Sequence, residues 1–234
     1  MSEIRFHRMD ISETEAARYT GDIAVDTETL GLIPRRDRLC VVQLSSGDGT
    51  ADVVQIVADQ PRPERLAALL ADSSRRKLFH YGRFDIAVLF HSFGITCEPV
   101  FCTKIASRLS RTYTDRHGLK DVTKELLDID LSKQQQSSDW AAATLSAAQL
   151  EYAASDVLHL HALTAKLTER LVRRIGNSIA LFCSQALRQG SRSPTEPALG
   201  SICRTLKADP SAEVRLSKGL PWGFPLQSAA KPRL

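Results

Sequence analysis

The stretch Ile23-Ala-Val-Asp26-Thr-Glu28 decides the fold, because a short apolar run passes directly into two carboxylates. The apolar residues before Asp26 are typical of a strand that enters a core. Residues i and i+2 of a strand face the same side, so Asp26 and Glu28 are expected to project together from the strand end. Taken alone, the pair is compatible with solvated surface acids or with part of a cation site.

The two acids also predict a particular ligand chemistry. Neighbouring carboxylates in a pocket raise each other's pKa, and a cation between them removes that penalty. Hard oxygen ligands suit Mg²⁺ or Mn²⁺ better than zinc.

Working outward from this strand, the pattern predicts an α/β domain. Further strands are expected at 39–44, 51–57, 77–80 and 100–102, and the turn residues 45–49 favour an antiparallel pairing of the first two. Helices are expected at 64–71 and 84–93, and one long helix opens at the capping box 146–149 and runs to about Arg173. Strands interleaved with helices, followed by helices alone, indicate a mixed β-sheet flanked by helices with a C-terminal helical half.

Two later stretches carry further acids in suggestive places. In His80-Tyr-Gly-Arg-Phe-Asp85, a strand meets a turn and Asp85 falls in the first turn of the next helix, where the helix dipole alone would favour an acid. In Tyr152-Ala-Ala-Ser-Asp156, the phenol and the carboxylate share one helix face. Each is compatible with an ordinary structural role when it is judged in isolation.

Composition bounds the class of protein without identifying a ligand. The chain has 234 residues, 43% hydrophobic and 25% charged, with no apolar run long enough for a membrane span and no apolar signal core at its start, so a cytoplasmic protein is expected. Five irregularly spaced cysteines argue against both a disulfide framework and a zinc site.

The net charge of +4 is unevenly spread. Residues 173–234 hold 10 Lys and Arg against 3 Asp and Glu, whereas residues 1–172 hold 21 against 24. Any role in nucleic-acid binding must therefore rest on a site in the body. The chain is expected to divide into a domain at 1–173 and a basic, Ser/Pro-rich tail at 174–234, which is either poorly ordered or an RNA-binding arm.

Together the motifs are far more specific than each one alone. Acids in the order D-x-E, F-D and Y-x₃-D resemble the DEDDy branch of the DnaQ-like 3′→5′ exonucleases, whose fold is related to ribonuclease H. The stretches 118–127, 138–140 and 150–157 resemble ribonuclease D, and the short size with Asp26–Leu32 and His80–Asp85 is most similar to nano-RNase C, a small α-proteobacterial relative. The resemblance covers roughly residues 1–172.

The resemblance implies a mechanism and the residues that perform it. Asp26, Glu28, Asp85 and Asp156 match four acids that bind two divalent cations, Mg²⁺ or Mn²⁺. Tyr152 matches the residue that orients or activates the attacking water, and a tyrosine of ordinary pKa favours orientation. The relatives assemble as ring-like octamers, which implies a homo-oligomer.

Substrate contacts are expected from two groups of residues. The first is Thr29 together with Leu32, which is either a wedge against the terminal base or a core or loop filler. The second comprises cations and aromatics that could hold phosphates or, in the stretch 108–117, could equally form a solvated helix face: His80, Arg83, Arg108, Arg111, Tyr113, Arg116 and His117.

The leading functional interpretation is a metal-dependent 3′→5′ exoribonuclease. It would act on short oligoribonucleotides, down to dinucleotides, and on single-stranded 3′ ends, and release 5′-mononucleotides. A 3′→5′ DNA exonuclease and a catalytically inert nucleic-acid-binding module remain as alternatives, because no residue reports clearly on the ribose 2′-hydroxyl.

Overall fold

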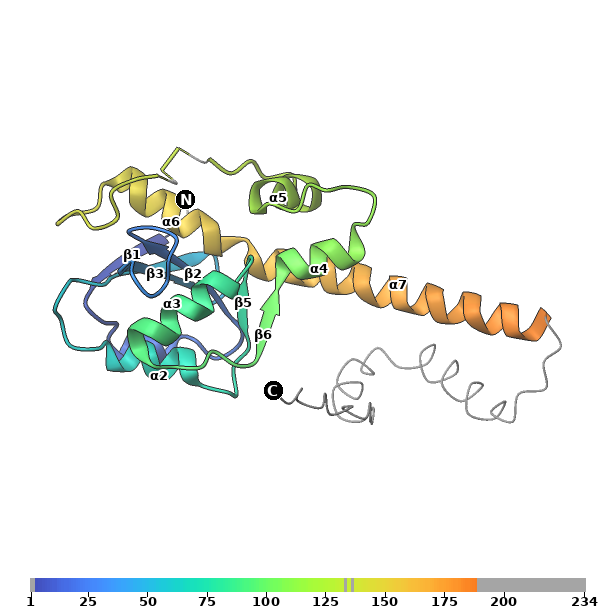
Figure 1. Ribbon diagram of the computed structural model, residues 1–234, viewed down its shortest axis with the longest axis horizontal. Coiled ribbons are helices and arrows are strands. Elements are labelled where there is room, and N and C mark those ends of the chain that lie inside the picture. The colour runs from blue at the N-terminus through green and yellow to red at the C-terminus, as the bar shows by residue number, and fades with distance from the viewer. Residues whose placement is uncertain (1–2, 133, 136, 189–234) are drawn as a thin grey trace, which may run out of the picture. The chain divides into compact units, whose positions relative to one another are not determined.

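The computed structural model of the protein describes residues 3–132, 134–135 and 137–188, with side chains up to residue 177 (Figure 1). The chain divides into two compact units, Met1–Val172 and Arg173–Leu234, and the fold below is that of the first. The last helix, α7 (Leu160–Arg188), continues beyond Val172, so the first residues of the predicted tail are helical. The rest of the predicted tail, residues 189–234, lies outside the described residues, and so does the expectation that it is poorly ordered.

The first unit is built on one mixed sheet of six strands. Its order is β1-β4-β3-β2-β5-β6, and the strands are β1 (Glu3–Arg8), β2 (Ile23–Thr29), β3 (Leu39–Ser45), β4 (Thr50–Gln55), β5 (Lys77–Phe79) and β6 (Val100–Cys102). The pairs β2–β3 and β3–β4 are antiparallel, whereas β1–β4, β2–β5 and β5–β6 are parallel. The predicted mixed sheet is therefore confirmed.

Helices cover both faces of the sheet (Figure 1). One face packs a core of side chains such as Ile23, Val25 and Val42 against α2 (Glu64–Ala71) and α3 (Arg83–Phe93), with the short α1 (Glu13–Ala17) at its margin. The opposite face packs Ala24, Ala51 and Val53 against α6 (Ala147–Leu158) and the start of α7. The shorter helices α4 (Thr103–Ser110) and α5 (Leu119–Leu127) follow β6.

The structure departs from the sequence prediction in three elements, of which the short helix α1 was simply not predicted. The strand β1 was not predicted, because its short mixed sequence becomes a strand only by pairing with β4 along its whole length. The long helix predicted from Ala147 to Arg173 is wrong in one respect, since it breaks at His159 into α6 and α7. Leu158 and Leu160 both pack against the same core cluster on either side of this break, and neither proline nor glycine marks it.

Among the described residues, no helix is both long and apolar enough to cross a membrane.

A buried carboxylate ties β1 to the rest of the sheet. Asp52 on β4 is fully buried and accepts hydrogen bonds from both Nε and Nη2 of Arg5, at 2.7 and 3.0 Å. His7 lies at 2.8 Å, and the Tyr19 hydroxyl donates at 2.5 Å. These partners offset the cost of burial and hold the pKa of Asp52 well below its ordinary value.

We expect Asp52→Ala to lower the free energy of unfolding by about 3–5 kcal/mol, because it leaves the nearly buried Arg5 guanidinium without its partner. Urea unfolding at pH 7 measures the change. Glu3→Gln is the control, since Glu3 is an exposed partner of the same arginine and should matter little. Equal stability of the Asp52 variant and the wild type would contradict the expectation.

Candidate active site

The strand β2 places two carboxylates at one end of a cleft. Asp26 and Glu28 are half-buried and share the face of the sheet that α6 covers, whereas Thr27 between them points to the opposite face. The pairing of β2 with β3 shifts register between Glu28 and Thr29. An interruption of the ladder of this kind, just beyond the two acids, is common beside functional sites.

A third carboxylate reaches the cleft from α3. Asp85 lies in the first turn of that helix, is 5% exposed, and accepts a hydrogen bond of 2.6 Å from the Thr27 hydroxyl. The helix can start this close to β5 because Gly82 lacks a side chain. A Cβ on Gly82 would lie 2.5 Å from Cβ of Phe79, so any larger residue would displace the helix start.

The helix α6 supplies the fourth carboxylate and the tyrosine. Its first turn is fixed by a capping box between Ser146 and Gln149. Tyr152 and Asp156 follow one turn apart, and the Tyr152 hydroxyl lies close enough to lower the pKa of Asp156. The Tyr152 ring packs against buried Trp140, with 6.0 Å between ring centroids and 39° between ring planes. This packing fixes the direction in which the phenol points.

The four predicted acids therefore converge, although they come from three separate parts of the chain. Carboxylate oxygens of Asp26, Glu28 and Asp156 all lie within 4.8 Å of one another. Burial and mutual repulsion raise the pKa of Asp26 strongly and that of Glu28 to about 8. Burial likewise raises the pKa of Asp85 to about 6 and, together with the charge of Asp85, that of Asp156 to about 7. Such a set of oxygen ligands fits a hard divalent cation, which would relieve the repulsion.

The cleft that contains these acids has a volume of about 910 Å³. Tyr152 and all four acids line it, and so do three of the predicted substrate contacts, Thr29, Leu32 and His80. The Leu32 side chain is 84% exposed at the cleft, which excludes a place in the core and leaves the base wedge and the loop filler as predictions. His80 is largely buried, which lowers its pKa to about 4, and its ring nitrogens contact Thr103 and the His117 carbonyl. A neutral His80 cannot attract a phosphate by charge.

The other predicted contacts do not line the cleft. Arg83, Arg108, Tyr113 and Arg116 are exposed elsewhere on the surface, and Arg111 and His117 are buried. Burial of Arg111 and His117 contradicts the expectation that these two side chains bind substrate, whereas contacts from the exposed Arg108, Tyr113 and Arg116 stay predictions.

Arg111 shows why this stretch is structural. Its guanidinium pairs with Glu125 on α5 and donates to the Ser107 hydroxyl at 2.8 Å and to the Arg116 carbonyl at 2.7 Å. The arginine thereby joins the end of α4 to α5 through the intervening loop. Its hydrogen bonds are used within the protein, which leaves little for a substrate.

The structure instead places two lysines in the cleft that the sequence prediction missed. Lys104 lies in the first turn of α4, and its Nζ lies 4.0 Å from the centroid of the exposed Tyr81 ring. Lys120 lies in the first turn of α5. Lys120 belongs to the 118–127 stretch that resembled ribonuclease D, and this was the only sequence signal for either lysine. Both lysines are cations that line the same cleft as the four acids.

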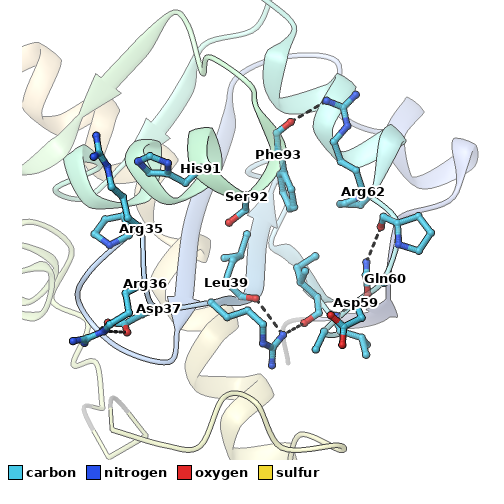
Figure 2. A pocket seen from close by; sticks show the side chains of 17 residues that line it. Arg35, Arg36, Asp37, Leu39, Asp59, Gln60, Arg62, His91, Ser92 and Phe93 are labelled. Atoms are coloured by element: carbon cyan, nitrogen blue, oxygen red, sulfur yellow. Dashed lines mark hydrogen bonds and ion pairs between the residues drawn. The ribbon is translucent and has the colours of Figure 1, made fainter.

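A second cavity, of about 690 Å³, lies at the far end of α3 (Figure 2). Two of the four arginines that line it are paired with acids, Arg36 with Asp37 and Arg62 with Glu64, and Arg62 also donates to the Phe93 carbonyl. Its two carboxylates, Asp37 and Asp59, come from separate loops, and the acidic cluster found among the described residues lies in the other cleft. The cleft between β2, α3 and α6 is therefore the candidate active site.

Comparison with known proteins agrees with this geometry. The sequence profile described as 3′-5′ exonuclease matches residues 10–172. The chain belongs to this exonuclease family. This chain is thus a member of a family of enzymes, and the predicted resemblance and fold class are confirmed.

Individual relatives are consistent with the family. Ribonuclease D of Granulibacter bethesdensis is 34% identical over 149 residues, which is 64% of this chain and 37% of that protein. The chain thus spans well under half the length of that relative. Two structures of Brucella melitensis NrnC cover more of the chain. The one bound to pGG has 50% identity, a TM-score of 0.71 and coverage of 96% of this chain and 100% of that one. The one with bound Mg²⁺ has 48% identity, a TM-score of 0.68 and coverage of 95% and 100%. The similarity thus reaches past the 1–172 that the motifs predicted.

The raised pKa values predict how pH changes stability without a cation. Relative to the ordinary carboxyl pKa values of 3.8 and 4.5, those of Asp85, Asp156 and Glu28 are raised to about 6, 7 and 8. The folded state then holds more protons than the unfolded state, so this contribution to stability is full below pH about 4 and is lost as the pH rises to about 8. We expect the melting temperature in EDTA to fall from pH 5.5 to pH 8.

In scanning calorimetry, Mg²⁺ should raise the melting temperature more at pH 8 than at pH 5.5, because the acids ionise more readily there. Asp26→Asn should flatten the pH dependence, since it removes one of the repelling charges. A melting temperature in EDTA that rises across this range would contradict the assignment of the four acids to one electrostatic cluster.

Proposed function

We propose that the protein is a metal-dependent 3′→5′ exoribonuclease that hydrolyses short oligoribonucleotides, down to dinucleotides, and single-stranded 3′ ends to 5′-mononucleotides. The observation that carries the proposal is the convergence of Asp26, Glu28, Asp85 and Asp156 in one cleft. Membership of the exonuclease family and the similarity to a nuclease solved with pGG support the choice of substrate.

The donor chemistry fits a pair of divalent cations held by the four carboxylates. Two such ions, when bound, stabilise the attacking and leaving oxygens of a phosphodiester and lower the pKa of water. Asp26, Glu28 and Asp156 are close enough to share one ion. Asp85 would complete the set from the opposite side of β2, where Thr27 holds its carboxylate. The similar protein with bound Mg²⁺ supports magnesium as a cation.

Tyr152 acts in this proposal by orientation. Burial and the neighbouring carboxylates raise its pKa far above the ordinary value of 10, so the phenol stays protonated at neutral pH. A protonated phenol can donate a hydrogen bond but cannot remove a proton. Its packing against Trp140 holds the hydroxyl at the acidic floor, where it can position a water for attack in line with the leaving oxygen.

The cleft wall supplies the substrate contacts. The exposed side chain of Leu32 offers an apolar surface to the terminal base, and the exposed Tyr81 ring offers a face on which a second base can stack. Lys104 and Lys120 are placed to neutralise backbone phosphates. A short single strand therefore finds stacking, charge and the acidic floor within one cleft.

A cleavage assay tests the proposal directly. The protein is incubated with 5′-labelled RNA and DNA oligomers and with a diribonucleotide, in Mg²⁺, Mn²⁺ or EDTA. We expect cation-dependent shortening from the 3′ end with RNA preferred, and Asp26→Asn should lower the rate by more than about 100-fold, beyond the usual effect of groups that only support a ligand. Asp128→Asn is the matched control, because Asp128 is exposed and pairs only with Lys124 among the described residues.

Two results would count against the proposal. Binding without shortening would favour an inert nucleic-acid-binding module. Faster shortening of DNA than of RNA would favour a DNA exonuclease.

A separate prediction concerns Lys104, one of the two lysines that line the cleft. Lys104→Met should raise KM for an oligoribonucleotide about 10-fold with little change in kcat, because it removes a phosphate contact that is shared by the ground state and the transition state. It should also reduce the slope of log Kd against log salt by about 0.7. Steady-state kinetics and fluorescence anisotropy at several salt concentrations measure both. Lys166→Met, an exposed lysine of α7 outside the cleft, should change neither, and an unaltered salt slope for Lys104→Met would remove Lys104 from the substrate path.

A further inference from the structure

Gln43 is a buried side chain with no partner, directly beside the acidic cluster. It lies in the middle of β3 and is 0% exposed, and neither its Oε1 nor its Nε2 has a hydrogen-bond partner in the described part of the chain. Its antiparallel partner on β2 is Asp26. Residues opposite each other in such a pair point to the same face, with Cβ atoms about 4.5–5.5 Å apart. The amide can therefore reach the Asp26 carboxylate.

Within the sheet, the other neighbours of Gln43 on this face offer it no hydrogen-bond partner. Two of its four nearest neighbours are valines, one along β3 and one across on β4. The third, Ser45, already donates its hydroxyl to the Thr50 carbonyl and accepts from the Gly47 amide. The fourth is Asp26. A buried amide without partners is costly and uncommon in native proteins, so its presence here points to a state in which it is paired.

We propose that Gln43 is a positioning residue for the cation site, whose Nε2 donates a hydrogen bond to the ionised Asp26 carboxylate and aims its other oxygen at the cation. The inference rests on the proposed function. An ionised carboxylate only accepts hydrogen bonds, so an amide donor on its protein side leaves the opposite oxygen for the ion. Asp26 has a neighbour of this kind across the ladder, on the side of the strand away from β5.

The proposal predicts opposite changes in metal affinity and in stability. Gln43→Met keeps the length of the side chain and removes both polar atoms. Loss of a group that orients a ligand typically weakens metal binding about 10- to 100-fold. We therefore expect the dissociation constant for Mg²⁺, measured by isothermal titration calorimetry, to rise about 10-fold or more. The melting temperature without cation should stay the same or rise, since the unpaired amide is gone.

Gln55→Met is the matched control. Gln55 is also a buried glutamine of the same sheet face, but it lies on β4 and its Nε2 donates to the Ala142 carbonyl at 2.8 Å. This variant should lower the melting temperature and leave the affinity for Mg²⁺ unchanged. An unchanged Mg²⁺ dissociation constant in Gln43→Met would overturn the role of Gln43.

The wild-type protein carries the test if Gln43→Met does not fold. Nuclear magnetic resonance of the Gln43 side-chain amide should show a shift and slower proton exchange when Mg²⁺ is added, and an amide that does not respond would overturn the inference. The outcome is separable from that of the proposed function. A wild-type protein that binds no Mg²⁺ removes the cation site itself, whereas Mg²⁺ binding with a silent Gln43 removes only this inference.

Discussion

Repulsion among four half-buried or buried carboxylates is the constraint around which this domain is built. Burial raises the pKa of all four acids, and neighbouring carboxylate charges raise the pKa of Asp26, Glu28 and Asp156 further, so the bare cluster opposes folding wherever it is ionised. The surrounding sheet tolerates the cluster because each acid is held by an element that is stable for other reasons. Asp26 and Glu28 lie in the central strand β2, Asp85 lies in the first turn of a helix packed on one face, and Asp156 belongs to a capped helix on the other. A functional site of this kind is a local cost supported by the rest of the fold.

Much of the fold could be predicted because its signals are local. The sequence pattern marks the start of the strand at Ile23 and both ends of the helix Glu64–Ala71. It also marks the end of α3 at Gly94, which has φ of 67°. The strand β1 could not be predicted, because its pairing with β4 and the buried contacts of Asp52 arise from residues about 45 positions away. The break at His159 is likewise set by packing on both sides of the bend rather than by a helix-breaking residue.

The site divides along the same line. The acids and Tyr152 could be located because their order and spacing carry the chemistry. The substrate residues could not, because charge alone does not say which way a side chain points. Arg111 illustrates the difficulty, since an arginine in a basic stretch was expected to bind substrate but is buried against Glu125. Lys104 and Lys120 were overlooked because they stand apart in the sequence and come together only when α4 and α5 line the same cleft.

The Arg111 bridge between α4 and α5 has a consequence for how such a domain could diversify. The four carboxylates and Tyr152 belong to β2, α3 and α6, whereas Lys104 and Lys120 belong to α4 and α5, the two short helices that Arg111 joins. The proposed substrate contacts and the four carboxylates therefore belong to different elements of the fold. Replacing the α4–α5 segment as one unit, with Arg111 and Glu125 retained, offers a way to change substrate preference while the four carboxylates stay in place.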